Sequence, residues 1–263
     1  MNSIIKASIA ATLLSTLAAT SFAANTPASA QVSVTPAERA KIETVVQQYL
    51  MQKPEVIIEA VQNFQRKQYE QAELTVKKTQ QTASTFAAPL FRQDLDPIAG
   101  NPKGKVTIVE FFDYQCTHCV DMAPVVDAII KANPDVRFVF KEFPIRGPLS
   151  DFAARAALAA NKQGKYYQFS HALLGSNKPL TQELVYEVAQ ASGVDVDQMK
   201  KDMNNIETNN QLKKNMKLGQ DLQLFGTPAF FIGKTDMSAS GSINYVPGRM
   251  DQAQLQEAID KTK

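Results

Sequence analysis

The chain of 263 residues contains only two cysteines, and its positive and negative charges nearly cancel. Two cysteines cannot build a disulfide-rich scaffold or complete a zinc site of four cysteines. Lys and Arg together number 28 and Asp and Glu number 26, which gives a net charge of +2. This balance argues against a nucleic-acid-binding protein with a broad basic surface. The length predicts one or two domains, and the hydrophobic share of 44% is that of a globular protein.

The sequence also lacks an apolar run long enough to cross a membrane, which takes about 20 residues. A shorter apolar segment at 7–19 follows Lys6, and small residues lead up to Ala23. This pattern predicts a secretory signal over 1–23 with cleavage after Ala23, or after Ala30 as the second choice. A short membrane anchor is the alternative, but no cysteine lies near the cleavage site, which excludes a lipoprotein anchor. Export would place the cysteine pair in an oxidising compartment.

Two helices are predicted ahead of the main domain. Thr35, Pro36 and Glu38 form a helix start, with a capping residue, a proline at the first position and a capping box. Apolar residues then repeat at helical spacing, namely Ile42, Val45, Val46, Tyr49 and Leu50. A break at Pro54 separates this helix from a second one, whose apolar face carries Ile57, Ala60, Val61 and Phe64.

The residues after these helices suggest how the segment is used. The chain is polar and rich in Gln beyond Phe64, and residues 82–102 hold three prolines and a glycine, which predicts a linker. Two helices with one apolar stripe each bury little surface alone. We therefore expect residues 24–84, called the N-terminal arm below, to pair with a second copy of the chain. The alternative is that the helices fold back onto the main domain.

The two cysteines lie between the first strand and the first helix of the main domain. Residues 106–112 are β-branched and aromatic and predict a buried strand. Cys116 and Cys119 follow, then a helical pattern over 120–132 and a second strand over 136–143. A Cys-x-x-Cys pair in this strand, helix, strand order is typical of a thioredoxin-like redox motif.

This placement suits thiol chemistry. Cys116 would stand at a helix N-terminus, where amide donors and the helix dipole favour a thiolate. His118 adds a hydrogen-bonding group that can carry positive charge between the cysteines. A stabilised thiolate makes the disulfide form a stronger oxidant. We assign Cys116 as the nucleophile and Cys119, one turn later, as the resolving thiol.

Two other interpretations of the pair remain open. A structural disulfide is one, although a bridge across so short a loop adds little stability. A metal site formed by Cys116, His118 and Cys119 is the other. It lacks nearby partners, since the second histidine, His171, lies about 50 residues away in the sequence and is expected to be an ordinary helix residue.

At these residues the chain resembles the disulfide bond protein A (DsbA) family of bacterial periplasmic thiol–disulfide oxidoreductases. The segment 110–119 resembles the family's strand and active site, 149–224 its helical insertion, and 225–232 its cis-proline strand. The resemblance covers about 100–263. It departs at Thr117, where the best-known members carry proline, and this residue tunes the redox potential.

The resemblance implies further site residues. Thr227 and Pro228 match the position that faces the active-site disulfide, with a cis peptide bond between them. An extended substrate could add there as a strand beside Cys116. Glu110 and Lys141 stand in neighbouring strands, and we expect a buried pair that relays the proton of Cys119. The alternative is that their side chains reach solvent at the strand ends.

The N-terminal arm resembles the oligomerising extensions of disulfide isomerases and of long family members. The resemblance thus implies an α/β, thioredoxin-like fold over 85–263 with a helical insertion, plus a helical dimerisation arm. It implies a periplasmic thiol:disulfide oxidoreductase that forms disulfides in exported proteins and, as a homodimer, isomerises wrong ones. A DsbB-like membrane oxidase or a DsbD-like reductase would reset the pair. We expect no cofactor beyond the Cys116–Cys119 disulfide, no metal and no nucleic acid.

Overall fold

A computed structural model of the protein describes residues 34–236 and 242–263. The predicted signal at 1–23 and its cleavage sites lie outside these residues. The chain divides into two compact units, with the boundary between Val61 and Gln62. In the described part of the chain, no helix is long and apolar enough to cross a membrane.

The first helix begins where the sequence predicts. Helix α1 (Pro36–Gln52) is capped by Thr35, whose hydroxyl accepts a hydrogen bond from the Glu38 N–H while its own N–H donates to the Glu38 carboxylate. This reciprocal pair is the predicted capping box. No residue of α1 is buried, and its apolar side chains at Ile42, Val45 and Tyr49 are each about half exposed or more.

The second helix is longer than the apolar pattern predicts. Helix α2 spans Glu55–Thr82, and its last turns pack against the C-terminal unit to which they belong. Thr79 donates to the carbonyl of Leu222 at 2.8 Å. The Gln80 side chain donates to the Ile243 carbonyl and accepts from the Tyr245 N–H, both at 2.7 Å. The polar residues after Phe64 therefore continue the helix, and the end of this helix is fixed to the main domain.

The predicted linker over 82–102 is wrong. This stretch forms the short helices η1 (Ala83–Phe86) and α3 (Ala87–Phe91) and the strand β1 (Ile98–Gly100). Leu90 and Phe91 are buried in the core. Pro89 lies within α3 and Pro97 directly precedes β1, so neither belongs to an extended connection. Consequently the C-terminal unit starts well before residue 85, the boundary that the composition suggests.

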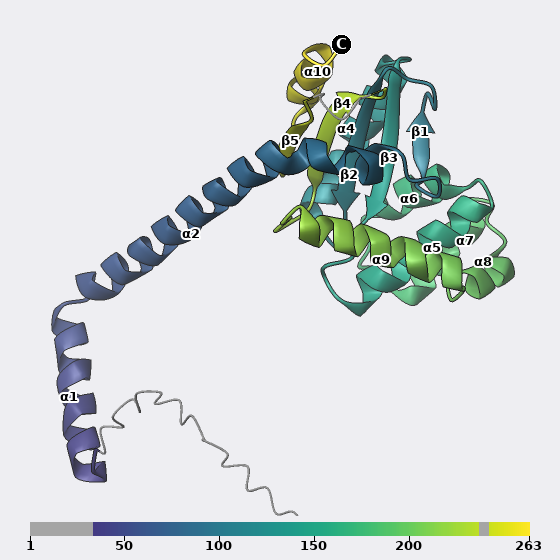
Figure 1. Cartoon of the computed structure of the whole chain (residues 1–263). Coiled ribbons are helices and arrows are strands. Elements are labelled where there is room, and N and C mark those ends of the chain that lie inside the picture. Colours follow the sequence, from purple (N-terminus) through teal and green to yellow (C-terminus); the bar gives the residue numbers. More distant parts are fainter. Residues whose placement is uncertain (1–33, 237–241) are drawn as a thin grey trace, which may run out of the picture. The chain divides into compact units, whose positions relative to one another are not determined.

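The C-terminal unit is built on a five-stranded sheet with the strand order β1-β3-β2-β4-β5 (Figure 1). Strand β2 (Val106–Phe112) runs parallel to β3 (Val136–Glu142), and α4 (Thr117–Ala132) connects them, as predicted. Strands β4 (Ala229–Lys234) and β5 (Asn244–Pro247) complete one side of the sheet in antiparallel pairing. The α/β class is thus confirmed.

Helices follow β3 and cover the sheet. The predicted insertion between β3 and β4 consists of α5 (Pro148–Lys162), α6 (Tyr166–Leu174), α7 (Gln182–Ala191), α8 (Val196–Asp202) and α9 (Ile206–Asp221). Helix α10 (Gln252–Asp260) packs against α4 at the end of the chain. The alanine-rich face of α5 lets it pack closely at the centre of the insertion.

Two hydrophobic cores lie on the two faces of the sheet. Ile108 and Phe112 of β2 point into the core shared with α4, α5 and α6. Val109 and Phe111 point into the opposite core, which includes residues of α3 and α9. All seven residues of β2 and of β3 are buried. Alternation along each strand therefore decides which core every side chain enters.

A buried ion pair joins β3 to the segment that was predicted to be a linker. Lys141 is fully buried, and its ammonium donates to the Asp96 carboxylate at 2.5 Å, to the Gln93 side chain at 2.7 Å and to the Pro89 carbonyl at 2.7 Å. Gln211 of α9 donates to the other oxygen of Asp96 at 2.6 Å. These bonds hold the end of α3 and the start of β1 onto the sheet.

We predict that Lys141→Met lowers the free energy of unfolding by about 3 kcal/mol, because it leaves the buried Asp96 without its counter-charge. The double variant with Asp96→Leu should recover much of the loss. Urea denaturation followed by circular dichroism measures both. Lys131→Met is the matched control, since it breaks an exposed ion pair with Asp127 that is worth at most about 1 kcal/mol. Equal effects of the two single variants would contradict the prediction.

Candidate redox site

The two cysteines stand where β2 passes into α4. Cys116 is the N-cap residue of α4 with extended backbone angles, and Cys119 lies in the first turn. Both are free thiols and both are buried, whereas the residues beside them, Gln115, Thr117 and His118, are exposed. The site therefore lies at the surface, with its two sulfurs turned inward.

The surroundings separate the acidities of the two thiols. The pKa of Cys116 is lowered to about 4, mainly by the hydrogen bond from the Cys119 side chain, with help from Thr227 and the backbone N–H groups of Cys119 and His118 against the effect of burial. Burial raises the pKa of Cys119 far above its usual range, and the hydrogen bond to Cys116 and the charge of Glu110 act in the same direction. Near neutral pH one thiolate and one thiol result.

The residues from the predicted cis-proline strand lie against Cys116. The peptide bond between Thr227 and Pro228 is cis. The Cys116 sulfur lies 3.1 Å from the backbone oxygen of Thr227, within hydrogen-bonding distance. Residues 111 positions apart in the sequence thus meet at one sulfur atom.

Glu110 shares a small cavity with Cys119. The cavity, of about 20 Å³, is also lined by Phe140, Ser170 and His171, and this volume is enough for one water molecule. Burial raises the pKa of Glu110 to about 8, and the neighbouring Cys116 charge adds to the rise. The carboxyl is therefore able to exchange a proton near neutral pH beside the resolving thiol.

The predicted Glu110–Lys141 pair is wrong. In the pairing of β2 with β3, Glu110 lies opposite Phe140, and Lys141 lies opposite Phe111. Residues that face each other across two strands point to the same side of the sheet, so Glu110 and Lys141 point to opposite sides. Lys141 bonds to Asp96 in the other core. Of these two residues, only Glu110 lies beside the cysteines.

A carboxylate that the sequence analysis missed holds the loops around Cys116. Asp113 is buried, and one of its oxygens accepts hydrogen bonds from the Gln115 N–H and the Ser150 hydroxyl, each at 2.7 Å. The other oxygen accepts from the Arg146 N–H at 2.9 Å. Ser150 stands in the first turn of α5, whose N-cap is Gly147, and its side chain turns to Asp113. The position of Asp113 directly after a buried strand is the signal that could have found it.

A second buried carboxyl was also missed. One oxygen of Glu142 accepts hydrogen bonds from Tyr114 at 3.0 Å and from Tyr166 at 2.7 Å. Its other oxygen has no hydrogen-bond partner in the part of the chain that the structure describes. Burial raises the pKa of Glu142 well above its usual range. Burial therefore disfavours a negative charge at this position.

Comparison with known families identifies this arrangement. The family described as DSBA-like thioredoxin domain matches residues 107–260, more than half of the chain. The chain belongs to the DSBA-like thioredoxin family. The expected thioredoxin-like fold with a helical insertion is therefore confirmed. Residues 38–71 match a second family, the copper resistance protein ScsC N-terminal domain.

Solved structures support the DSBA-like assignment. A thioredoxin-like oxidoreductase from Silicibacter pomeroyi DSS-3 is 41% identical, with a TM-score of 0.60 over 66% of this chain and 95% of that one. BcfH of Salmonella enterica Typhimurium is 34% identical, with a TM-score of 0.62 over 86% of this chain and 96% of that one. The catalytic domain of Proteus mirabilis ScsC, at 23% identity and a TM-score of 0.60, shares the fold.

Curated relatives of the DSBA-like domain differ in length. The Na(+)/H(+) antiporter NhaA 3 of Salinispora tropica is 26% identical over 141 residues, which is 53% of this chain and 22% of that protein. The chain thus spans less than a quarter of the first curated relatives it matches. The probable disulfide bond formation protein D of Bacillus anthracis is 26% identical over 185 residues, 65% of this chain and 80% of that protein.

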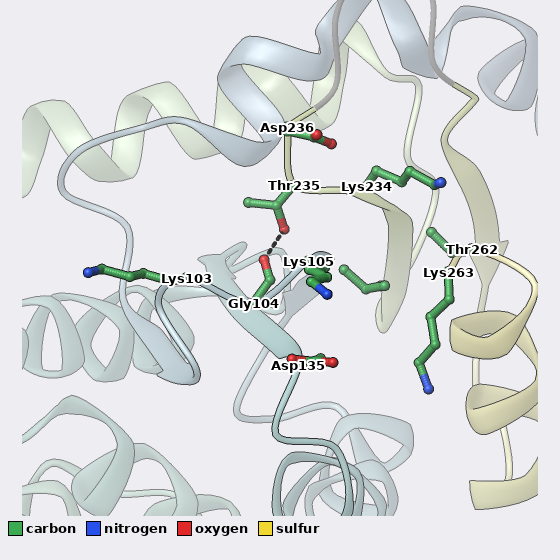
Figure 2. A pocket seen from close by; sticks show the side chains of 10 residues that line it. Lys103, Gly104, Lys105, Asp135, Lys234, Thr235, Asp236, Thr262 and Lys263 are labelled. Carbon is green, nitrogen blue, oxygen red and sulfur yellow. Dashed lines mark hydrogen bonds between the residues drawn. The ribbon is translucent and has the colours of Figure 1, made fainter.

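A larger cavity of the DSBA-like domain lies apart from the cysteines. A cavity of about 510 Å³ is lined by Lys105 at the start of β2, by Lys234 at the end of β4 and by Lys263 (Figure 2). The length of β2 separates it from the cysteine pair by about 20 Å. His171 stacks on Tyr167 in α6, and no group of three or more candidate metal ligands occurs among residues 34–236 and 242–263.

We predict that Glu110→Gln removes a pH dependence of stability. A carboxyl whose pKa is raised from 4.5 to about 8 holds its proton more tightly in the folded state, so the free energy of unfolding falls as pH rises through this window. The variant should therefore be more stable than the parent at pH 8.5, by a few kcal/mol.

Urea denaturation at pH 4.5 and pH 8.5 measures this effect. The disulfide form is used because it has no thiols that titrate between these pH values. Glu257→Gln is the control, since it removes an exposed carboxylate that pairs with Lys261. A parent protein and a Glu110→Gln variant with the same change in stability between the two pH values would contradict the assignment.

Proposed function

We propose that this DSBA-like protein is a periplasmic thiol:disulfide oxidoreductase that forms disulfide bonds in exported proteins. The observation that carries the proposal is the contact of a low-pKa Cys116 with the backbone of Thr227 at the cis-proline, beside a high-pKa Cys119. This combination suits a nucleophile with a resolving partner and a site for an extended substrate. The family match supports the same class of reaction.

The reaction transfers two electrons from a substrate dithiol to the cysteine pair. A substrate thiolate attacks the Cys116 sulfur of the disulfide, and the bond to Cys119 breaks, so that Cys119 leaves as a thiolate. Glu110 supplies the proton that Cys119 takes up, through the water-sized cavity between them. A second substrate thiolate then attacks the substrate sulfur of the mixed disulfide and releases the Cys116 thiolate. A membrane oxidase of the DsbB type would re-form the disulfide.

The remaining site residues have supporting roles in this proposal. Thr227 and Pro228 align the substrate backbone beside Cys116. His118 adds its N–H to the donors around the Cys116 sulfur, and its exposed ring meets the substrate. Thr117, the first residue of α4, tunes the redox potential from between the cysteines.

We predict that Cys116→Ser abolishes the reduction of insulin disulfides by dithiothreitol that the protein catalyses. Cys119→Ser should instead accumulate mixed disulfides with substrate, because the attacking sulfur remains and the resolving sulfur is gone. Turbidity of insulin and non-reducing gel electrophoresis measure the two outcomes. Full insulin reduction by Cys116→Ser, with an unchanged circular dichroism spectrum, would rule out the proposal.

A separate experiment tests the alternative, a metal-binding or metal-resistance protein that uses Cys116, His118 and Cys119. The description of the family matched by 38–71 mentions copper, but these residues contain neither cysteine nor histidine. Stoichiometric metal in the purified protein, with cysteines that react with a thiol reagent only after chelation, would favour this alternative over the redox function.

We further propose that the N-terminal arm joins two copies of the chain and so supports isomerisation of wrong disulfides. The apolar row of α1 is exposed, with Val45 at 64% and Tyr49 at 51%. An exposed apolar row on a helix is typical of a surface that another chain covers. Two cysteine pairs in one dimer could act on one held substrate, and a DsbD-like reductase would keep such pairs reduced.

We predict a dimer by light scattering, which Val46→Asp should convert to a monomer because it places a charge in the apolar row. Gln48→Asp is the matched control, since it adds the same charge to the same helix at a polar position. Reactivation of a scrambled ribonuclease should fall with the dimer, while insulin reduction persists. A monomeric parent protein would remove the basis for isomerisation.

A further inference from the structure

The side chain of Arg146 lies over the Cys116 sulfur. Its Nη2 atom is 3.8 Å from Sγ. Cys116 has 0% exposed surface, whereas Arg146 is exposed. The side chain of an exposed residue therefore contacts a sulfur that is itself closed to solvent. No residue pattern in the sequence pointed to this contact, because Arg146 lies 30 positions after Cys116.

The backbone of Arg146 is held firmly although its side chain is exposed. Its N–H donates to the buried Asp113 carboxylate at 2.9 Å, and the Ser150 hydroxyl donates to the same carboxylate. The Phe143 N–H donates to the Phe112 carbonyl at 3.0 Å and ties the start of this loop to the end of β2. The loop is therefore fixed at both ends to the segment that carries Cys116.

A turn at Gly147 directly follows Arg146. Gly147 has a φ of +107°, a conformation that residues with a side chain rarely adopt, and Pro148 begins α5 directly afterwards. This turn joins the Arg146 loop to α5. The Arg146 side chain lies beside the sulfur, with Nη2 3.8 Å from Sγ.

The charge of Arg146 acts in the same direction as the other groups at this sulfur. Cys119 and the N–H groups at the start of α4 favour the Cys116 thiolate by hydrogen bonding. The charge of Cys116 helps to raise the pKa of Glu110, so an ionised Glu110 opposes the thiolate. A guanidinium cannot lose its charge in the working pH range, so its effect is constant.

We propose that Arg146 is a cationic cover of Cys116, which stabilises the thiolate of the reduced form and moves aside when a substrate reaches the sulfur. The inference rests on the proposed function, in which Cys116 is the nucleophile. It predicts two separable effects, one of charge and one of cover. Stabilising the thiolate makes the disulfide more oxidising, so the charge effect also appears in the redox equilibrium.

Three substitutions separate the two effects. Arg146→Met keeps a long side chain without the charge, Arg146→Ala removes both charge and cover, and Arg146→Lys keeps the charge. Because Asp113 is bonded to the backbone of Arg146, all three variants retain that bond. Lys103→Met is the control, since it removes one positive charge at the far end of the sheet.

We predict that Arg146→Met raises the pKa of Cys116 by about half a unit to one unit, read from thiolate absorbance at 240 nm against pH. The equilibrium constant for reduction of the disulfide by glutathione should fall about three- to tenfold. Arg146→Ala should show the same shifts and, in addition, at least a threefold faster reaction with iodoacetamide at a pH where Cys116 is fully ionised. Arg146→Lys and Lys103→Met should stay near the parent values.

Parent-like pKa values and alkylation rates in both Arg146→Met and Arg146→Ala would overturn the inference while leaving the proposed function intact. A parent protein without thiolate absorbance below pH 7 would instead contradict the proposed function itself. If Arg146→Ala raises the pKa of Cys116 but leaves the alkylation rate unchanged, Arg146 does not cover the sulfur and has only an electrostatic role.

Discussion

Strand β2 is covered on both faces, and the arrangement of the site depends on this burial. Each side chain along it enters one of two cores, so Glu110 lies under α4 while its neighbours Val109 and Phe111 enter the opposite core. The strand ends at Phe112 with no freedom to shift, because a slip of one residue would exchange the two faces. Asp113 and the cysteine segment that follow therefore start from a fixed point.

A single helix terminus and a single carboxylate then organise the chemistry. The N-terminus of α4 provides the N–H groups that favour a thiolate at Cys116. Asp113 joins the cysteine loop to the loop before α5 and to α5 itself through three hydrogen bonds. Carboxyls placed deeper, at Glu110 and Glu142, have raised pKa values because burial disfavours their ionised forms. Burial thus disfavours a negative charge at these two carboxyls.

Local patterns predicted the central part of this molecule well. The buried strand, the cysteine pair at a helix start and the second strand are all visible within 106–143, since each depends on neighbouring residues. The start of α1 at Thr35 was equally clear, because a capping box is a local feature. The cis bond at Pro228 followed only from resemblance to a family, since nothing local distinguishes it from a trans proline.

What could not be predicted depends on pairing over long distances. An ion pair between Glu110 and Lys141 was predicted because both stand in neighbouring apolar strands. The register of β2 and β3 places them on opposite faces of the sheet. Residues 82–102 looked like a linker because of their prolines. The buried side chains of Leu90 and Phe91 and the Asp96–Lys141 pair show that this stretch belongs to the core. The contact of Arg146 with Cys116 could not be predicted, because the position of Arg146 depends on a turn at Gly147 and a hydrogen bond to Asp113.

The attachment of the end of α2 to the sheet affects how readily the protein can aggregate. Strand β5 is an outer strand, and an outer strand with free N–H and C=O groups invites pairing with a foreign chain. The Gln80 amide donates to the Ile243 carbonyl and accepts from the Tyr245 N–H, as a sixth strand would. One glutamine side chain thus blocks part of an edge at which aggregation could begin.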